Sequence, residues 1–149
     1  MVKFAVESVG AVRGEIEPLL QAHYEEIAAN RDVISLDVDW GKYEAMERDS
    51  ALRVFTARDE GILCGYSVFF LFWHMHYKST LFAQNDVLFL SKEARKGRAG
   101  SRLIEFSEER LKEDGVVKLT WHIKADNDWS PILKRKKYLK AEIIMSKVL

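Results

Sequence analysis

Residues 87–104 read VLFLSKEARKGRAGSRLI. The apolar run that ends at Leu90 predicts a buried strand, and the apolar spacing after Ser101 predicts a helix. Between them lies a basic loop that contains Gly97 and Gly100. The start of a helix presents unpaired backbone N–H groups and the positive end of the helix dipole, which together bind anions. We therefore interpret this segment as a phosphate-binding strand, loop and helix, and we expect the ligand to be a phosphorylated cofactor.

Length and composition restrict the class of protein. The chain has 149 residues and is 48% hydrophobic, which predicts a single domain over residues 1–149. Acidic and basic residues balance at 23 each, so no overall field favours nucleic acid or an anionic membrane, and we expect neither partner. Cys64 is the only cysteine, the amino terminus does not resemble a secretory signal, and no apolar stretch is long enough to span a bilayer. These features predict a cytoplasmic protein.

Hydrophobic periodicity predicts ten elements in the order β-α-α-β-β-β-α-β-α-β. The expected strands cover residues 4–9, 51–57, 62–73, 79–90, 116–123 and 138–149, and the expected helices cover residues 15–29, 40–48, 101–114 and 127–136. Both prolines are expected near helix starts. This order predicts a mixed α/β fold with a mostly antiparallel central sheet and helices on both faces. One β-α-β crossover runs through the glycine loop.

The loop and the order of elements resemble the GNAT superfamily of acyl-CoA-dependent N-acetyltransferases over nearly the whole chain. In that family a strand of the form Leu-x-Val precedes Arg/Gln-x-x-Gly-x-Gly/Ala. Arg95 and Gly100 match this motif, whereas Arg98 stands where the first glycine is expected and Gly97 lies one place earlier. Either the loop shifts its permissive position or it tolerates a side chain there. Segments such as 23–27 also resemble small acetyltransferases of bacteriophages and prophages.

The resemblance implies acetyl-CoA as the co-substrate, with no metal. The main chain of the strand would bind the pantetheine arm at an opened sheet edge, and a backbone N–H would stabilise the oxyanion while an amine attacks the thioester. The loop would bind the pyrophosphate. The residues implied in cofactor binding are Leu88, Phe89, Leu90, Arg95, Lys96, Gly97, Arg98, Ala99, Gly100 and Ser101.

Three residues are candidates for proton transfer, fewer than the residues implied in cofactor binding. Asp86 precedes the expected cofactor strand and is either the base that deprotonates the amine or a strand-start residue that faces water. The family's acid, a tyrosine, falls on Leu133 here, so Tyr138 either reaches back from the next element or is a core aromatic. His122 is a further candidate for proton transfer. His74 and His76 share a sheet face without an obvious third metal ligand, which does not favour a metal site.

Two functions follow. The leading one is transfer of an acetyl group from acetyl-CoA to a primary amine of a small molecule or protein. The alternative is a GNAT-fold binding module without turnover, which acts on a host protein or nucleic acid through the basic run 134–137; Arg98 and Leu133 motivate this alternative. The aromatic residues Trp40, Tyr43, Trp73 and Trp129 line a substrate cleft or belong to the core. The final strand is either internal or pairs across a homodimer.

Overall fold

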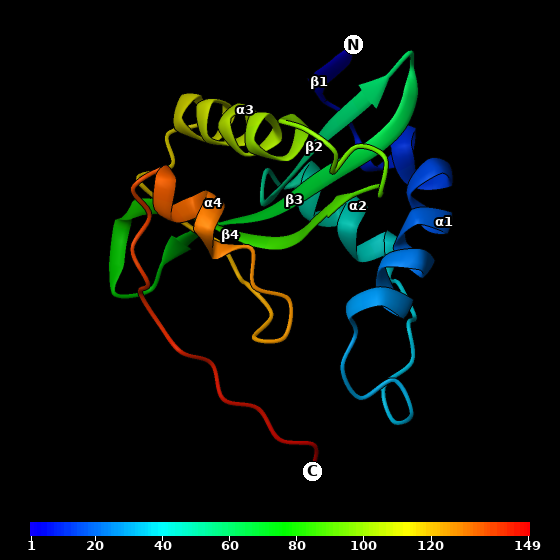
Figure 1. The fold of residues 1–149 in the computed structure, drawn as a ribbon. Helices are drawn as coiled ribbons and strands as arrows, with labels where there is room; N and C mark the ends of the chain where they lie inside the picture. The colour runs from blue at the N-terminus through cyan, green and yellow to red at the C-terminus, as the bar shows by residue number, and fades with distance from the viewer.

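The computed structural model describes all 149 residues and contains one five-stranded sheet. The strands lie in the order β1-β2-β3-β4-β5, and helices cover both faces (Figure 1). Neighbouring strands are antiparallel except β4 and β5, which are parallel. The strands are β1 (Val2–Val6), β2 (Leu52–Asp59), β3 (Ile62–His74), β4 (Tyr77–Leu90) and β5 (Lys118–Thr120). The predicted mixed α/β architecture is confirmed.

Four helices accompany the sheet: α1 (Val9–Ile27), α2 (Trp40–Arg48), α3 (Ala99–Glu113) and α4 (Ser130–Arg135). Strand residues alternate between two cores because successive side chains point to opposite faces. Val54 packs with α1 and α2, whereas its neighbour Phe55 packs with α3. The expected β-α-β crossover is the path from β4 through α3 to β5. We refer below to the α1/α2 face and the α3 face of the sheet.

Side-chain caps fix where α1 and α2 begin. Ser8 Oγ accepts the N–H of Ala11 at 3.2 Å, and Asp39 Oδ1 accepts that of Lys42 at 2.9 Å. The Glu47 carboxylate accepts the first N–H of α1, at Val9, with its two oxygens at 3.0 and 3.2 Å. This contact ties the end of α2 to the start of α1 and so places α2 beside the sheet.

The first helix is longer than predicted. It begins at Val9, not at residue 15, and Pro18 lies inside it and not near its start. Val9, the last residue of the strand expected over residues 4–9, and Gly10 after it both lie within the helix. Two glycines lower the local helix propensity of this stretch, so the prediction was wrong there. The Ser8 cap and the burial of Val9 and Val12 against the sheet outweigh that cost.

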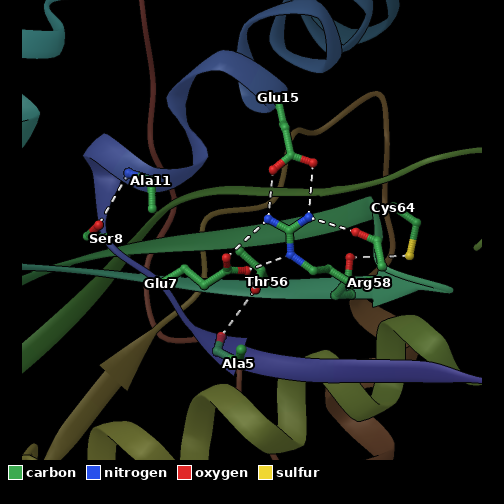
Figure 2. Close-up of polar contacts among 10 residues, drawn as sticks. Ala5, Glu7, Ser8, Ala11, Glu15, Thr56, Arg58 and Cys64 are labelled. Atoms are coloured by element: carbon green, nitrogen blue, oxygen red, sulfur yellow. Dashed lines mark hydrogen bonds and ion pairs between the residues drawn. The ribbon is translucent and has the colours of Figure 1, made fainter.

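A network around Arg58 joins α1 to the sheet (Figure 2). Arg58 Nε donates to Glu7 at 2.9 Å, and its Nη2 donates to Glu15 of α1 at 2.8 Å. The guanidinium holds the pKa of both glutamates below their usual range, through hydrogen bonds first. Beside Arg58, Glu60 and Gly61 both have positive φ, at 49° and 84°, and form the turn of the β2–β3 hairpin.

The carboxyl-terminal strand predicted at residues 138–149 does not form. This segment is neither helix nor strand and runs away from the sheet (Figure 1). β5 is also shorter than predicted, with three residues in place of 116–123. A β-rich segment forms a strand only where it has an edge long enough to pair with, and the β5 edge within this chain offers three residues. The segment therefore leaves large side chains exposed, among them Leu139, Ile143, Ile144, Met145, Val148 and Leu149.

Candidate active site

A β-bulge in β4 places Asp86. Val68 of β3 is opposite Val87 and the next residue, Phe69, is opposite Asn85, so Asp86 is the extra residue between them. A bulge changes the direction in which a side chain points. Here it sends Asp86 to the α1/α2 face, where it meets Tyr43 of α2.

Asn85 holds the bulge in place. Its side chain is buried, and its Nδ2 donates to the carbonyl oxygens of Val68 at 3.2 Å and Val87 at 3.0 Å. The amide group thus satisfies backbone acceptors that the irregular ladder leaves free. Sequence reasoning missed this role, because only the strand register reveals it.

The bulge also marks the point where β4 and β5 separate. The two strands pair only over Phe82–Gln84 and Lys118–Thr120. Beyond Asp86, Leu88, Phe89 and Leu90 pair with β3 alone. The edge of β4 that faces away from β3 is therefore available there to an extended ligand.

Asp86 and Tyr43 form the polar centre of the site. Tyr43 Oη donates to Asp86 Oδ2 at 2.5 Å. The carboxyl is open to solvent on one side and crowded by protein on the others, and this loss of solvation raises the pKa of Asp86. The Tyr43 hydrogen bond and then the charge of His122 oppose this rise in the pKa of Asp86. Burial raises the pKa of Tyr43.

Tyr66 of β3 lies on the α1/α2 face, the same face as Asp86 and Tyr43. Its side chain is fully buried, and its hydroxyl has no hydrogen-bond partner in the protein. Burial, followed by the charge of Asp86, raises the pKa of Tyr66. Tyr66, Tyr43 and Val87 contribute to the lining of an apolar cavity of about 20 Å³ between the sheet and the two helices. That volume is comparable with one water molecule.

The basic loop meets α3 with free donors. α3 begins at Ala99 with no side-chain cap, and its first backbone bond runs from Arg102 N to Arg98 O at 2.9 Å. The N–H groups of residues 98–101 therefore have no acceptor in the protein. Arg98 has a φ of −98°, which any L-residue adopts, so the loop tolerates a side chain at the family's glycine position.

Arg95 connects the loop to α1. Its guanidinium pairs with the Glu26 carboxylate through two contacts, at 2.5 and 3.0 Å. Its Nε donates to the carbonyl oxygen of Leu90 at 2.9 Å, and the group lies 5.8 Å from the centre of the Phe89 ring. The ion pair lowers the pKa of Glu26. Sequence reasoning did not find Glu26, because 69 residues separate it from Arg95.

Tyr138 is not brought to this centre. Its hydroxyl donates to Glu108 of α3 at 2.6 Å, on the other face of the sheet. Leu133, at the family's tyrosine position, is buried in α4. Within the basic run 134–137, the Lys136 side chain pairs with Glu105. Asp86 and Tyr138 thus lie on opposite faces of the sheet.

Other sequence candidates have plain structural roles. The Cys64 thiol donates to the carbonyl of Ala57 at 3.3 Å, and His74 Nδ1 accepts the N–H of His76 at 3.1 Å. No group of three His, Cys, Asp or Glu side chains is arranged to hold a metal ion. No helix combines the length and apolar character needed to cross a bilayer.

Comparison with known proteins identifies the family of this chain and structures that share its fold. Residues 15–131 match the model of the acetyltransferase (GNAT) family. No curated protein sequence matches it significantly. Solved structures share the fold. An aminoglycoside acetyltransferase from an uncultured soil metagenomic sample, in complex with sisomicin, has a TM-score of 0.75 at 14% identity, covering 99% of this chain and 96% of that chain.

Two other acetyltransferases of known structure share the same fold. The ribosomal-protein-alanine N-acetyltransferase of Brucella melitensis biovar Abortus 2308 has a TM-score of 0.69 at 20% identity, covering 100% of this chain and 98% of that chain. The glucosamine-6-phosphate N-acetyltransferase of Arabidopsis thaliana has a TM-score of 0.70 at 14% identity, covering 99% and 98%. The family match defines the class as an acyltransferase that uses acetyl-CoA. The chain belongs to the GNAT acetyltransferase family.

Proposed function

We propose that this protein transfers an acetyl group from acetyl-CoA to a primary amine by direct attack on the thioester. One observation carries the proposal: β4 loses its second neighbour after the bulge at Asp86, in the same stretch that leads to the free N–H groups at the start of α3. An acyl thioester on a long polar arm with a diphosphate needs this combination of an open strand edge and unpaired donors.

The residues proposed to hold the co-substrate divide into two groups. The main chain of Leu88, Phe89 and Leu90 pairs with the amide-bearing arm. The loop and first helical turn bind the diphosphate through backbone N–H groups and positive side chains; these residues are Arg95, Lys96, Gly97, Arg98, Ala99, Gly100 and Ser101. Arg95 is already neutralised by Glu26, so it orders the loop more than it adds charge.

Asp86 is the proposed base. An amine arrives protonated, and a carboxylate whose pKa is raised by burial is better matched to remove that proton near neutral pH. The amine nitrogen then bonds to the acyl carbon and the carbon–sulfur bond breaks. The second proton that the nitrogen loses passes to the thiolate, through His122 or through water. Tyr138 is the weaker candidate for this proton transfer, because its hydroxyl is bound to Glu108.

The test is calorimetry with acetyl-CoA, followed by detection of free coenzyme A in the presence of primary amines. We expect micromolar binding, and we expect Gly100→Trp to abolish it, because the new side chain starts next to the free N–H groups of α3. Gly14→Trp is the matched control, since Gly14 is exposed on α1 with no atom within 4 Å of an added Cβ. Equal loss in both variants, or no binding by the wild type, would refute the proposal.

The absence of a tyrosine at Leu133 favours one alternative, a binding module that retains the fold without turnover. The same experiment separates the two functions. Binding of acetyl-CoA without release of coenzyme A, across small amines and amino-terminal peptides, would support the module, whose partner would be a host protein or nucleic acid.

We also propose that two copies of the chain associate through residues 139–149. The segment exposes large apolar side chains, and the outer edge of β5 has no neighbour in the sheet. If residues 139–149 of a second copy formed a strand beside β5, this strand would pair with the open edge and bury the exposed apolar side chains. Light scattering on the full chain should give a dimer, and removal of residues 139–149 should give a monomer; a monomer in both cases would refute this proposal.

A further inference from the structure

Part of the α1/α2 face carries a row of aromatic side chains. Phe72 of β3 is opposite Phe82 of β4, with ring centres 6.0 Å apart, and Phe70 is opposite Gln84. Tyr77 stacks on Phe82 at 6.2 Å with an interplanar angle of 6°. We call Phe70, Phe72, Phe82 and Tyr77 the aromatic row.

The aromatic row leads directly to the proposed base. The Tyr43 ring, whose hydroxyl binds Asp86, lies 6.4 Å from the ring of Phe70. At the far end the row is open to solvent, with Phe72 38% and Tyr77 59% exposed. Strand geometry places the Cα atoms of Phe82 about 13 Å and of Gln84 about 7 Å from that of Asp86. The His74 ring lies 4.8 Å from Phe82 and 4.9 Å from Tyr77, and Gln84 is opposite Phe70. The row is therefore a mostly aromatic surface that leads to one carboxylate.

Charge on this surface is sparse. Asp86 is the only acidic residue that β3 and β4 place on the α1/α2 face. The acids of α2 and of its cap have partners: Asp39 accepts the N–H of Lys42, Glu44 lies 3.9 Å from Arg13, and Glu47 binds the N–H of Val9. One amine already lies on the row, since Lys118 Nζ is 5.8 Å from the centre of the Phe82 ring.

Building on the proposed function, we propose that the acceptor is an arylalkylamine, a primary amine joined to an aromatic ring by a short alkyl chain. The amine lies at Asp86 and the ring lies on the aromatic row. A flat apolar body buries its surface against the exposed rings, and aromatic pairs add to that gain. A polyamine or aminosugar would place several charges or hydroxyls on a surface that offers one acid.

The test compares kcat/KM for phenethylamine and tryptamine with that for spermidine and glucosamine, at saturating acetyl-CoA. We expect the arylalkylamines to be preferred by at least tenfold. Phe72→Ser should raise KM for phenethylamine about tenfold and leave the KM for acetyl-CoA unchanged. Trp73→Ser is the matched control, because Trp73 is the adjacent residue, is 62% exposed and lies on the opposite face of the sheet.

The outcomes are distinct. Preference for spermidine or glucosamine would overturn this inference and leave the acetyltransferase proposal intact. Equal effects of Phe72→Ser and Trp73→Ser on the KM for phenethylamine would also overturn it. Failure to bind acetyl-CoA, or binding without transfer to any amine, would refute the proposed function and this inference with it.

Discussion

The Tyr43 hydroxyl donates a hydrogen bond to the Asp86 carboxylate across 2.5 Å, joining α2 to the bulge of β4. The bond favours the ionised carboxylate, whereas burial favours the neutral acid. Burial is the larger effect, so the pKa of Asp86 is raised overall. The two residues thus set the protonation state of the proposed base, and each can be changed without altering the backbone.

Asp86→Asn should lower kcat by about 100-fold to 10,000-fold, the range that a general base contributes. The amide keeps the size of the side chain and can still accept from Tyr43, so the bulge should persist. Calorimetry should show unchanged acetyl-CoA affinity, because the proposed cofactor contacts lie elsewhere. A kcat within threefold of the wild type would exclude Asp86 as the base.

Tyr43→Phe should move the acidic limb of the pH–kcat/KM profile to higher pH. The variant removes a hydrogen bond that lowers the pKa of Asp86, so the carboxyl should need a higher pH to ionise. The phenyl ring keeps its contact with Phe70, which leaves the packing intact. A limb that stays in place, or moves to lower pH, would contradict this prediction.

Gly65→Ala should destabilise the fold by about 1–3 kcal/mol in denaturant unfolding. A Cβ there would lie 2.9 Å from the carbonyl oxygen of Phe89, on the neighbouring strand, and this backbone atom cannot move away freely. Gly97→Ala is the matched comparison, because nothing lies within 4 Å of its added Cβ. That variant should be neutral or more stable by about 0.4–1 kcal/mol; the reverse ranking would be inconsistent with the observed spacing of β3 and β4.

The Arg58 network should make stability depend on acid pH. The folded pKa of Glu7 is below its ordinary value of 4.5, so its contribution is complete above that pH and is lost as pH falls through the folded pKa. The wild type should therefore lose free energy of unfolding between about pH 5 and pH 3. Arg58→Met should be less stable at pH 7 and should flatten this dependence. An equally steep loss in the variant would assign the effect to other carboxylates.

Local sequence patterns predicted most of the fold, because most elements depend on residues within the element itself. The helix at 40–48 and the turn at Glu60-Gly61 follow directly from periodicity and turn residues. The predictions that were wrong concern elements that depend on contacts with other parts of the chain. The start of α1 depends on a cap and on burial against the sheet, and a strand at 138–149 depends on a partner edge.

The candidate site was predictable only in part. The strand, loop and helix at 87–104 form one contiguous segment, so the free N–H groups of α3 could be expected from the sequence. The partners of that segment come from far along the chain. Tyr43 of α2 reaches Asp86 because the bulge turns Asp86 toward α2, and Glu26 reaches Arg95 because the end of α1 lies beside the loop after β4. No pattern of residue spacing in the sequence predicts these contacts.

The one-sided pairing of β4 at Leu88–Leu90 has a consequence for the protein's behaviour in solution. Backbone amides there should exchange with deuterium faster than those of β3, which has neighbours on both sides. A ligand that occupies the vacant side acts as a missing strand, so saturation should slow this exchange and raise the melting temperature together. Mass spectrometry could thus locate the bound molecule without a crystal.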